Sequence, residues 1–289
     1  MSTVVLLTLT GLGLAALYFL VAAGLSLIFG LADVLNFAHG LFLSVGAYAT
    51  WWCYERVPGG FWVAALFGVG CGAAVATLVE LVLIRPLYSR TIEQVLVTVG
   101  LSLAGVALLQ AAWGADARPF PSPQWTQRLT RVGGANVPND SLLLIVAAVA
   151  VLGALLAFLR FTRYGLIIRA GVEDRSMVTA LGIDVRKAFT LVFAIGGAAA
   201  ALAGVLGGVY FGAVSPATGS SLLIFGFIVV VIGGMGSVVG SAYAAAAVGL
   251  LQQFVNYYGA PGAGDVCAVA LLALVLLVRP QGLTGSVAT

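Results

Sequence analysis

The sequence predicts an all-α fold, a polytopic bundle of transmembrane helices with about eight spans and a possible ninth, formed by residues 1–289 as a single domain. Of the 289 residues, 62% are hydrophobic and only 8% are charged, whereas soluble domains carry about 25% charged residues. The few charges are spaced so that long apolar runs remain, close to the roughly 20 residues that cross a bilayer. The chain is therefore expected to be an integral membrane protein.

Eight apolar runs have the length and hydropathy of a membrane span. The first of them has no basic segment before it and exceeds the usual signal-peptide core of about 7–15 residues, so we expect it to remain as a helix. A further alanine-rich stretch, 242–258, either continues a helix broken after GGMGSVVG or spans separately as a ninth crossing. The eight runs are 4–29, 36–53, 61–84, 93–113, 141–159, 188–211, 221–241 and 263–278.

The distribution of basic residues predicts the orientation, because short cytoplasmic loops collect Lys and Arg. The connector 160–187 is rich in arginine and is expected to be a cytoplasmic loop, whereas the proline-rich connector 114–140 is expected to be the longest external loop. Eight crossings place the N-terminus outside, and a ninth would move one end. The residues that mark the inside are Arg85, Arg90, Arg160, Arg163, Arg169, Arg175, Arg186, Lys187 and Arg279.

The connector 160–187 is more polar than a link between two helices requires. We expect a short helix from about Val172 to Leu181, ended by a glycine in the left-handed conformation. Such a helix could lie on the membrane surface as a structural element, or it could dock in a groove of a cytoplasmic partner. The residues that would form this surface are Glu173, Asp174, Met177, Ala180, Leu181 and Gly182.

Polar side chains inside the apolar runs are candidates for a solute path, because such groups usually face a protein interior or a wet cavity. Asn36 and His39 follow the first run, and Gln94, Thr98 and Ser102 recur every four residues in the fourth. Each set has a structural alternative. Asn36 could cap the second span while His39 satisfies a nearby carbonyl, and the hydroxyls could bond back to their own helix.

Two further patterns bear on packing and on the path. Gln252, Gln253 and Asn256 gather before a Gly/Pro turn and could form a rim of the pathway. Small residues recur every four positions in the sixth span, which lets two helices approach closely, either within this subunit or against a partner permease. The members of this stripe are Gly196, Ala200, Gly204, Gly208 and Gly212.

The sequence lacks the residues that several other functions require. The phosphate-binding pattern GxxxxGK[ST] is absent, and the single lysine, Lys187, stands outside any such pattern. Three cysteines make no CxxC pair and there is one histidine, so no metal site, catalytic site or cofactor is expected. Nothing suggests a nucleic-acid partner. A self-contained secondary transporter or channel and a membrane-embedded enzyme remain as the alternative classes.

Three separated segments carry a family resemblance: LIFGLADVLNFAHGLFLSVGAY from residue 27, RAGVEDRSMVTALGIDVRKAFTLVFAIGGAAAALAGVLGGVYFG from residue 169, and LLALVLLVRPQGLTG from residue 271. In these the chain resembles the LivH family, the permease subunits of ABC importers for branched-chain amino acids. The resemblance implies that the loop helix is the ATPase-coupling element, with Glu173, Ala180 and Gly182 at the recognisable positions.

The resemblance also implies the partners and the location. These are a second homologous permease, two cytoplasmic ATP-binding subunits that bind the ATP, and a periplasmic substrate-binding protein, assembled at the bacterial inner membrane. The expected function is import of branched-chain or related small neutral amino acids by alternating access. Relatives of this kind also carry urea and short amides, which stand as the alternative cargo.

Overall fold

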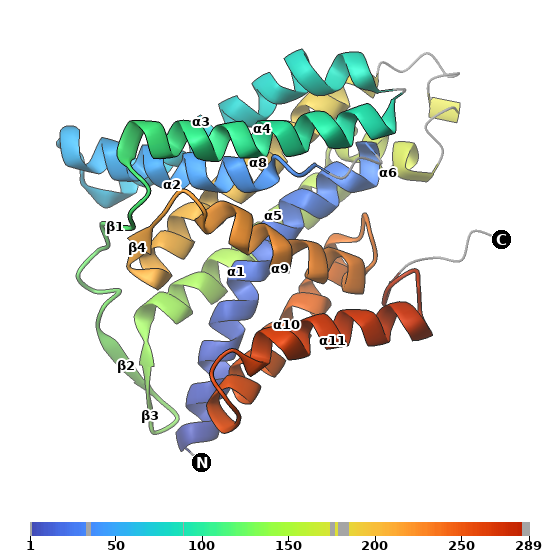
Figure 1. Ribbon diagram of the computed structural model, residues 1–289. Coiled ribbons are helices and arrows are strands. Elements are labelled where there is room, and N and C mark those ends of the chain that lie inside the picture. Colours follow the sequence, from blue (N-terminus) through green and yellow to red (C-terminus); the bar gives the residue numbers. More distant parts are fainter. Residues whose placement is uncertain (1, 33–35, 89, 174–176, 179–184, 285–289) are drawn as a thin grey trace.

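The computed structural model of the chain describes residues 2–32, 36–88, 90–173, 177–178 and 185–284 (Figure 1). Within these residues nine apolar helices form a bundle and a shorter helix, α6 (Arg163–Glu173), lies at one end of it. The bundle helices are α1 (Ser2–Ala32), α2 (His39–Arg56), α3 (Gly60–Val79), α4 (Thr91–Trp113), α5 (Asn139–Phe161), α8 (Val185–Phe211), α9 (Thr218–Gly233), α10 (Val238–Tyr258) and α11 (Ala263–Val278).

The predicted all-α membrane fold is confirmed. By length and hydropathy six helices could each cross a bilayer, among them α1, α8 and α10, and the shorter α9 and α11 are also apolar. The described helices agree with the ninth predicted crossing rather than with eight. With nine helices α1 starts at one end of the bundle and α11 ends at the other, so Arg279, directly after α11, falls at the same end as the arginine-rich connector.

The predicted run 221–241 is wrong at its C-terminal end. Helix α9 stops at Gly233, and Gly234 and Gly236 adopt φ values of 99° and 88°, a region that side chains disfavour. Ser237 then caps α10, its Oγ accepting from the Gly240 N–H at 3.0 Å. The GGMGSVVG segment therefore reverses the chain, and 242–258 belongs to a separate helix. A hydropathy window cannot detect such a turn when both flanks are apolar.

Short strands mark one end of the bundle, which we call the loop face. Strands β2 (Leu129–Val132) and β3 (Ala135–Pro138) form a hairpin, and β1 (Arg118–Pro119) pairs antiparallel with β4 (Ala213–Val214) just after α8. The start of α1 also lies here, packed against β3. The opposite end, which we call the α6 face, carries α6 and the end of α11 (Figure 1).

The bundle consists of two halves in opposite orientation. Helix α1 runs from the loop face to the α6 face, and α8 runs back. Helix α1 packs against α8, α9 and α10, while α8 packs against α1, α2 and α3. The connectors 33–38 and 212–217, of equal length, then lead into α2 and α9. The sequence α1 to α4 thus matches α8 to α11, an inverted arrangement common in transport folds.

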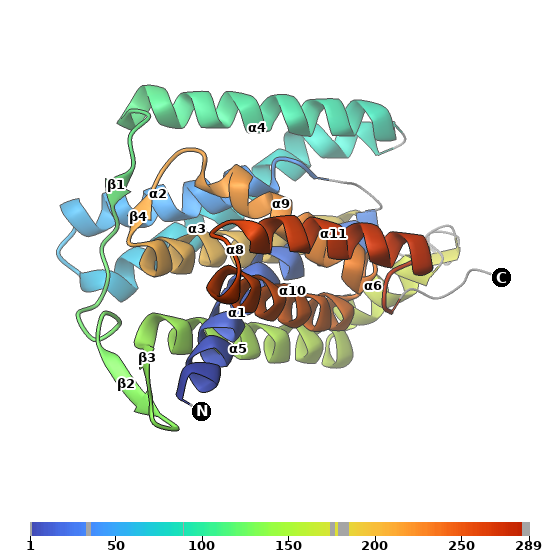
Figure 2. The same cartoon turned by 60° about the horizontal axis from the view of Figure 1, so that its bottom comes forward.

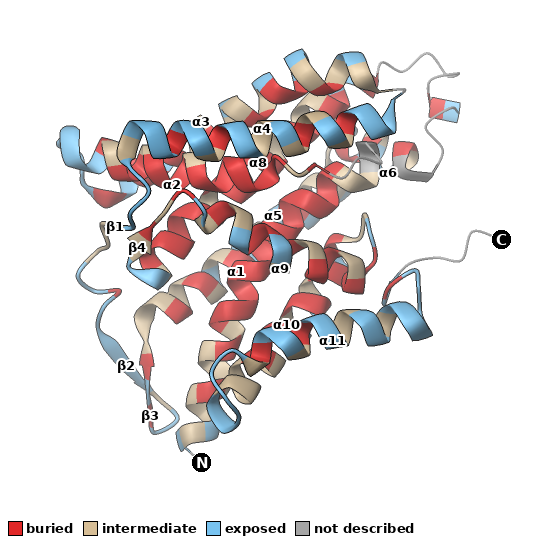
Figure 3. Ribbon diagram, in the orientation of Figure 1, coloured by how far each residue is buried: buried red, intermediate tan, exposed pale blue. Residues whose placement is uncertain are grey.

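Burial follows the same arrangement (Figure 3). Helices α1 and α8 are buried along most of their length, whereas α4 and α11 have apolar side chains such as Leu103, Leu108 and Leu277 on the surface. Figure 2 shows α4 separated from the centre, along one edge of the bundle. Apolar surfaces of this extent are expected to contact lipid.

Candidate functional site

The residues just before α2, 36–38, lie inside the bundle. Asn36 and His39 are both buried, and α2 begins at His39. The Asn36 Oδ1 accepts from the Ala38 N–H at 3.0 Å, and the His39 Nε2 donates to the Val21 carbonyl at 3.1 Å. Val21 lies well inside α1, so the second helix starts within the apolar layer rather than at its surface. The predicted carbonyl partner of the histidine therefore has a counterpart. The predicted cap is wrong, because Ala38 occupies the cap position of α2 without a side-chain hydrogen bond and the Asn36 side chain bonds to the Ala38 N–H instead.

Two polar atoms at this break have no hydrogen-bond partner among the described residues, the Asn36 Nδ2 and the His39 Nδ1. Buried polar groups are normally paired, so such atoms point to water or to a second conformation of the protein. The role of Asn36 and His39 in a solute path stays a prediction.

The starts of α2 and α9 meet in what we call the α2–α9 junction, formed by Gly40, Ser44, Pro216 and Gly219. A Cβ atom on Gly40 would lie 2.8 Å from the Gly219 carbonyl oxygen, so the two backbones touch. The Ser44 hydroxyl donates to the Pro216 carbonyl at 3.4 Å. The first N–H of each helix is paired, since those of His39 and Thr218 donate to the Asn36 and Ser215 carbonyls, but a helix start still carries a partial positive charge. Two such starts therefore face each other inside the bundle.

A polar cavity of about 500 Å³ lies beside the start of α9, near the loop face. Its walls come from α1, the end of α8, the start of α9, the end of α10 and the start of α11. The side chains with polar atoms that line it are Tyr18, Tyr210, Ser215, Thr218, Ser221, Gln252, Gln253, Asn256 and Asp265. The predicted rim residues Gln252, Gln253 and Asn256 are thus brought together in one cavity.

Hydrogen bonds connect one wall of the cavity. The Tyr18 hydroxyl donates to the Gln252 Oε1 at 2.8 Å, and the Gln252 Nε2 donates to the Asp265 Oδ1. The Tyr18 ring stacks on Phe225, with centroids 4.8 Å apart. Sequence reasoning missed Tyr18, Thr218 and Asp265. The sequence does show Asp265 as a carboxylate in an apolar run. Its position opposite α9 follows only from the folded structure.

The polar line on α4 lies elsewhere. Gln94 and Thr98 are buried near the α6 face, whereas Ser102 is half-buried. The Gln94 Nε2 donates to the Leu87 carbonyl, and the Thr98 hydroxyl bonds back to Val95 at 3.0 Å. Among the described residues that line the cavity, none comes from α4. A path role for this line stays a prediction, and the bond of Thr98 to its own helix matches the structural alternative.

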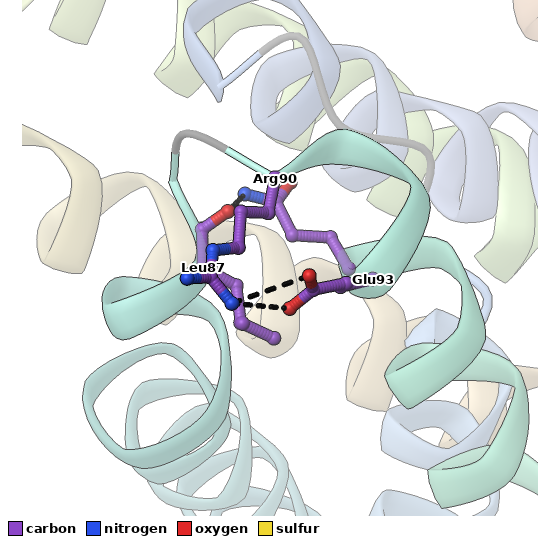
Figure 4. A network of polar contacts seen from close by, with 4 residues as sticks. Leu87, Arg90 and Glu93 are labelled. Carbon is purple, nitrogen blue, oxygen red and sulfur yellow. Dashed lines mark hydrogen bonds and ion pairs between the residues drawn. The ribbon is translucent and has the colours of Figure 1, made fainter.

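Two charged side chains, those of Arg90 and Glu93, form an ion pair at the start of α4. The Arg90 N–H donates to the Leu87 carbonyl at 2.8 Å, and the Arg90 Nη1 lies 3.1 and 3.2 Å from the two carboxylate oxygens of Glu93 (Figure 4). Both charged side chains are largely exposed. The pair orders the turn before α4 but contributes little free energy, as is usual for exposed ion pairs.

A buried carboxylate joins α3 to α8 near the α6 face. Glu80 begins the π-helical turn η1 (Glu80–Ile84), which η2 (Arg85–Leu87) follows. Its Oε1 accepts from the Tyr88 hydroxyl, and its Oε2 accepts from the Thr190 hydroxyl at 2.8 Å. The carboxylate is fully buried, and each of its oxygens accepts a hydrogen bond from a hydroxyl group, which satisfies its charge more strongly than neutral pairs would.

The small-residue stripe packs within the chain over most of its length. Gly196 lies against Ile28 and Gly24 of α1, Gly204 against the backbone of Leu43, and Gly208 against the ring of Phe120. Ala200 is also buried. Gly212 departs from the stripe. It follows the end of α8 with a φ of 69°, and its carbonyl accepts from the Phe120 N–H at 3.0 Å. The four-residue spacing continues in sequence, but the helix does not.

The connector 160–187 contains a helix that the sequence did not predict. Helix α6 begins at Arg163 and ends at Glu173, so it overlaps the predicted helix 172–181 only at its end. Met177 is exposed and Val178 is buried. Of the proposed docking surface, Asp174, Ala180, Leu181 and Gly182 lie outside the described residues, as does the side chain of Glu173.

The described part of the chain contains no group of three or more His, Cys, Asp or Glu residues that could bind a metal ion. Cys53, Cys71 and Cys267 are free thiols.

Inverted halves, helices that start inside the bundle and a polar cavity beside them define the class of multi-pass membrane permeases. The family model described as "Branched-chain amino acid transport system / permease component" matches residues 7–278. The chain belongs to this family. As a permease component it is a transport subunit rather than an enzyme, and it works with further components of a transport system at the bacterial inner membrane.

Individual relatives agree over nearly the whole chain. The permease protein LivH of the high-affinity branched-chain amino acid transport system of Escherichia coli is 29% identical over 95% of this chain and 93% of its own. BraD of Pseudomonas aeruginosa is 30% identical over 95% of this chain and 94% of its own. A probable branched-chain amino acid transport permease protein LivH of Methanocaldococcus jannaschii is 27% identical over 92% of this chain and 88% of its own.

Proposed function

We propose that the chain is one of two permease subunits of an ATP-driven, binding-protein-dependent importer of branched-chain amino acids. The observation that carries the proposal is the family match over 7–278, joined to the polar cavity beside the start of α9. Relatives over the full length are named for branched-chain amino acids, which favours this cargo over urea or short amides.

The loop face is proposed to be external. Connector 114–140 then receives the substrate-binding protein, and the cavity is open to the delivered solute. The arginine-rich α6 face is proposed to be cytoplasmic, in accord with the bias of basic residues toward inside loops.

Two ATP-binding subunits are proposed to dock on the α6 face and to bind the ATP. The segment from Glu173 to Gly182 is the coupling element, and α6 supports it. One face of α6 is buried through Gly165 and Ile168, while Tyr164 and Leu166 are exposed beside it. Apolar side chains at a cytoplasmic surface suit a groove of a partner protein. A homologous second permease completes the complex.

Alternating access would use the inverted halves. Closure of the ATPases would move the α6 face, and the helices that begin at the α2–α9 junction would move against each other. The cavity would then lose its opening at the loop face and gain one at the other, because broken helices at a repeat interface move readily as rigid pieces.

The test is co-purification of the permease with its ATP-binding subunits. We expect wild type to retain them, and Glu173→Lys and Gly182→Leu each to lose them by at least about tenfold, the factor for a loss of roughly 1.4 kcal/mol. Glu55→Lys is the matched control, since Glu55 is exposed at the far end of α2 near the loop face.

Retention of the second permease checks that the variants are folded. Absence of ATPases from wild type, or their full retention by both variants, would contradict the coupling element. The chain would then have to be tested as a transporter that works alone, by uptake into vesicles without ATP.

A further inference from the structure

We infer that a groove on the side of the bundle, formed by α1, α5 and α10, binds one anionic phospholipid. Arg169 contacts the phosphate group, and an acyl chain lies over α1 between the other two helices. The site itself does not depend on the proposed import function. Only its assignment to the cytoplasmic leaflet of the membrane rests on the proposed orientation.

Two cavities follow the same three helices at different depths. The first, of about 170 Å³, lies midway along the bundle, and every described residue that lines it is apolar. The second, of about 230 Å³, lies at the α6 face, between the ends of α1 and α5, the start of α10 and one side of α6. Helices α5 and α10 both pack along α1 but touch each other at few points. A groove over α1 is therefore left between them.

The distance between the two cavities matches the depth of a lipid. Leu152 lines the first cavity and Leu159, seven residues further along α5, lines the second. Seven helical residues rise about 10 Å, and one leaflet is half of a hydrocarbon core about 30 Å thick. A lipid with its phosphate at the second cavity therefore extends an acyl chain into the first.

Charge identifies the headgroup end of the groove. Arg169 is the one charged residue among the described residues that line the second cavity, and Leu27, Ile168 and Val238 form its apolar walls. Arg169 is exposed and forms no ion pair with a described residue. Arginine binds phosphate through parallel N–H groups, and basic residues at the end of a membrane helix attract anionic headgroups. An unpaired guanidinium beside an apolar pocket therefore suits a phosphate that carries a hydrocarbon chain.

The surroundings of the groove favour lipid as the occupant. Figure 2 shows α5 along the edge of the bundle opposite to α4. Val149 lines the groove, and both Val149 and Leu156, two turns further on, are exposed. At the α6 face the aromatic rings of Phe161 and Tyr164 are also exposed, as is typical of the membrane interface. A soluble partner does not reach the depth of Val149, whereas acyl chains surround it.

The experiment measures lipid binding to the full chain, purified in detergent alone and together with its partner subunits. Native mass spectrometry counts the bound lipids, and the rise in melting temperature gives the half-saturating lipid concentration. We expect one tightly bound phosphatidylglycerol per chain. Phosphatidylcholine, which has no net charge, should bind about fivefold more weakly, the factor for one charge contact near the membrane surface. Glycerol phosphate, which lacks acyl chains, should not raise the melting temperature.

Arg169→Gln is expected to raise the half-saturating concentration of phosphatidylglycerol about 10-fold to 100-fold, the factor for losing hydrogen bonds to a charged group. Arg169→Lys keeps the charge and should retain most of the preference for phosphatidylglycerol over phosphatidylcholine. Arg163→Gln is the matched control, because Arg163 is an exposed arginine of the same helix that does not line either cavity. It should leave the half-saturating concentration unchanged.

The apolar part of the groove has its own pair of variants. Ala246 lines the first cavity, whereas Ala247, the next residue of α10, is exposed and does not. Ala246→Phe is expected to abolish the tightly bound phosphatidylglycerol, because the ring occupies the path of the acyl chain. Ala247→Phe should bind the lipid as wild type does. The melting temperatures without lipid show whether the two variants are equally well folded.

Equal binding of the two phospholipids, equal losses in Arg169→Gln and Arg163→Gln, or full binding by Ala246→Phe would each overturn the inference. Stabilisation by glycerol phosphate alone would show a free anion site instead. Binding to the isolated chain that disappears in the complex would show that another subunit covers the groove, and it would also overturn the inference. The importer proposal fails separately, since absence of ATPases from the purified protein leaves the lipid measurement on the chain alone intact.

Discussion

At the scale of single residues, close backbone contact is the strongest constraint in the centre of the molecule. Gly40 and Gly219 touch where α2 and α9 begin, and Gly24 and Gly196 touch where α1 crosses α8. Each pair joins the two inverted halves. In a membrane, where apolar burial drives little helix association, such small residues allow the van der Waals contacts that hold helices together.

Gly40→Ala is expected to destabilise the protein by about 1–3 kcal/mol, since the new methyl group would lie 2.8 Å from the Gly219 carbonyl oxygen and force the helices apart. Gly100→Ala is the matched control. It lies on α4 with open space around it, so alanine should stabilise by about 0.5–1 kcal/mol through helix propensity.

Thermal unfolding of the purified complex in detergent measures both changes. If the melting temperature rose in both variants, helix propensity rather than backbone contact would decide the effect at Gly40.

The candidate site could be predicted in part at this scale. Asn36 and His39 stand out because polar groups are rare in apolar runs, and Gln252 and Asn256 stand out for the same reason. Tyr18 and Thr218 carry no such signal, because each has an ordinary packing role in a helix. Their place in the cavity follows from contacts between helices that are far apart in sequence, such as α1 with α10.

At the scale of elements, the π-helical turn η1 connects α3 to α8. It places the Glu80 carboxylate between the hydroxyls of Tyr88 and Thr190. Tyr88 also packs its ring on Phe189 of α8, with centroids 4.6 Å apart. These contacts lie close to the start of α8, which follows the proposed coupling segment. They would carry a displacement of α8 to α3 as one rigid piece.

Glu80→Ala and Thr190→Val are expected to be coupled in a double-mutant cycle. The interaction free energy should be about 0.5–3 kcal/mol, the range for residues in one hydrogen-bond network. Glu93→Ala is the matched control, because its exposed pair with Arg90 should contribute about 0–1 kcal/mol.

The measurement is the change in melting temperature of the complex, together with ATPase activity stimulated by the binding protein. Additive effects of the two substitutions would contradict a functional link between α3 and α8 through Glu80.

Elements differ in how far they were predictable. The runs 93–113, 141–159 and 263–278 coincide closely with α4, α5 and α11, because polar residues or glycine flank them. The boundary of α9 and α10 was misplaced, because its turn consists of glycines among apolar residues. Helix α6 was missed, because its alternation of arginines with apolar residues is typical of a surface loop as well as of a helix.

For the whole molecule, the two inverted halves determine at which end of the bundle the described chain begins and ends. Helix α1 starts at the loop face and α11 ends at the α6 face, so the two ends of the described chain lie at opposite ends of the bundle (Figure 1). Arg279 and the arginine-rich connector thus lie at one end, which is in accord with the proposal that this end faces the cytoplasm.

Single cysteines in a cysteine-free background test this orientation. Asn136→Cys on the β2–β3 hairpin should react with an impermeant thiol reagent in intact cells. Leu166→Cys, exposed on α6, should react only after the membrane is opened. The reverse pattern would invert the proposed topology, and with it the direction in which the cavity opens.

The sequence by itself determined the class of protein, most of the helices and the family. These follow from local properties, since hydropathy, loop charge and short motifs are read along the chain. The structure brings Gly40 into contact with Gly219, so that the start of α2 corresponds to the start of α9.

Only the tertiary structure decided this correspondence, the separate turn at 234–237, the burial of Glu80 and the cavity around Asp265. Each depends on which helices touch, and in lipid that choice rests on close packing of small residues and on pairing of buried polar groups. Both are sums over contacts between distant segments, so no local pattern in the sequence expresses them.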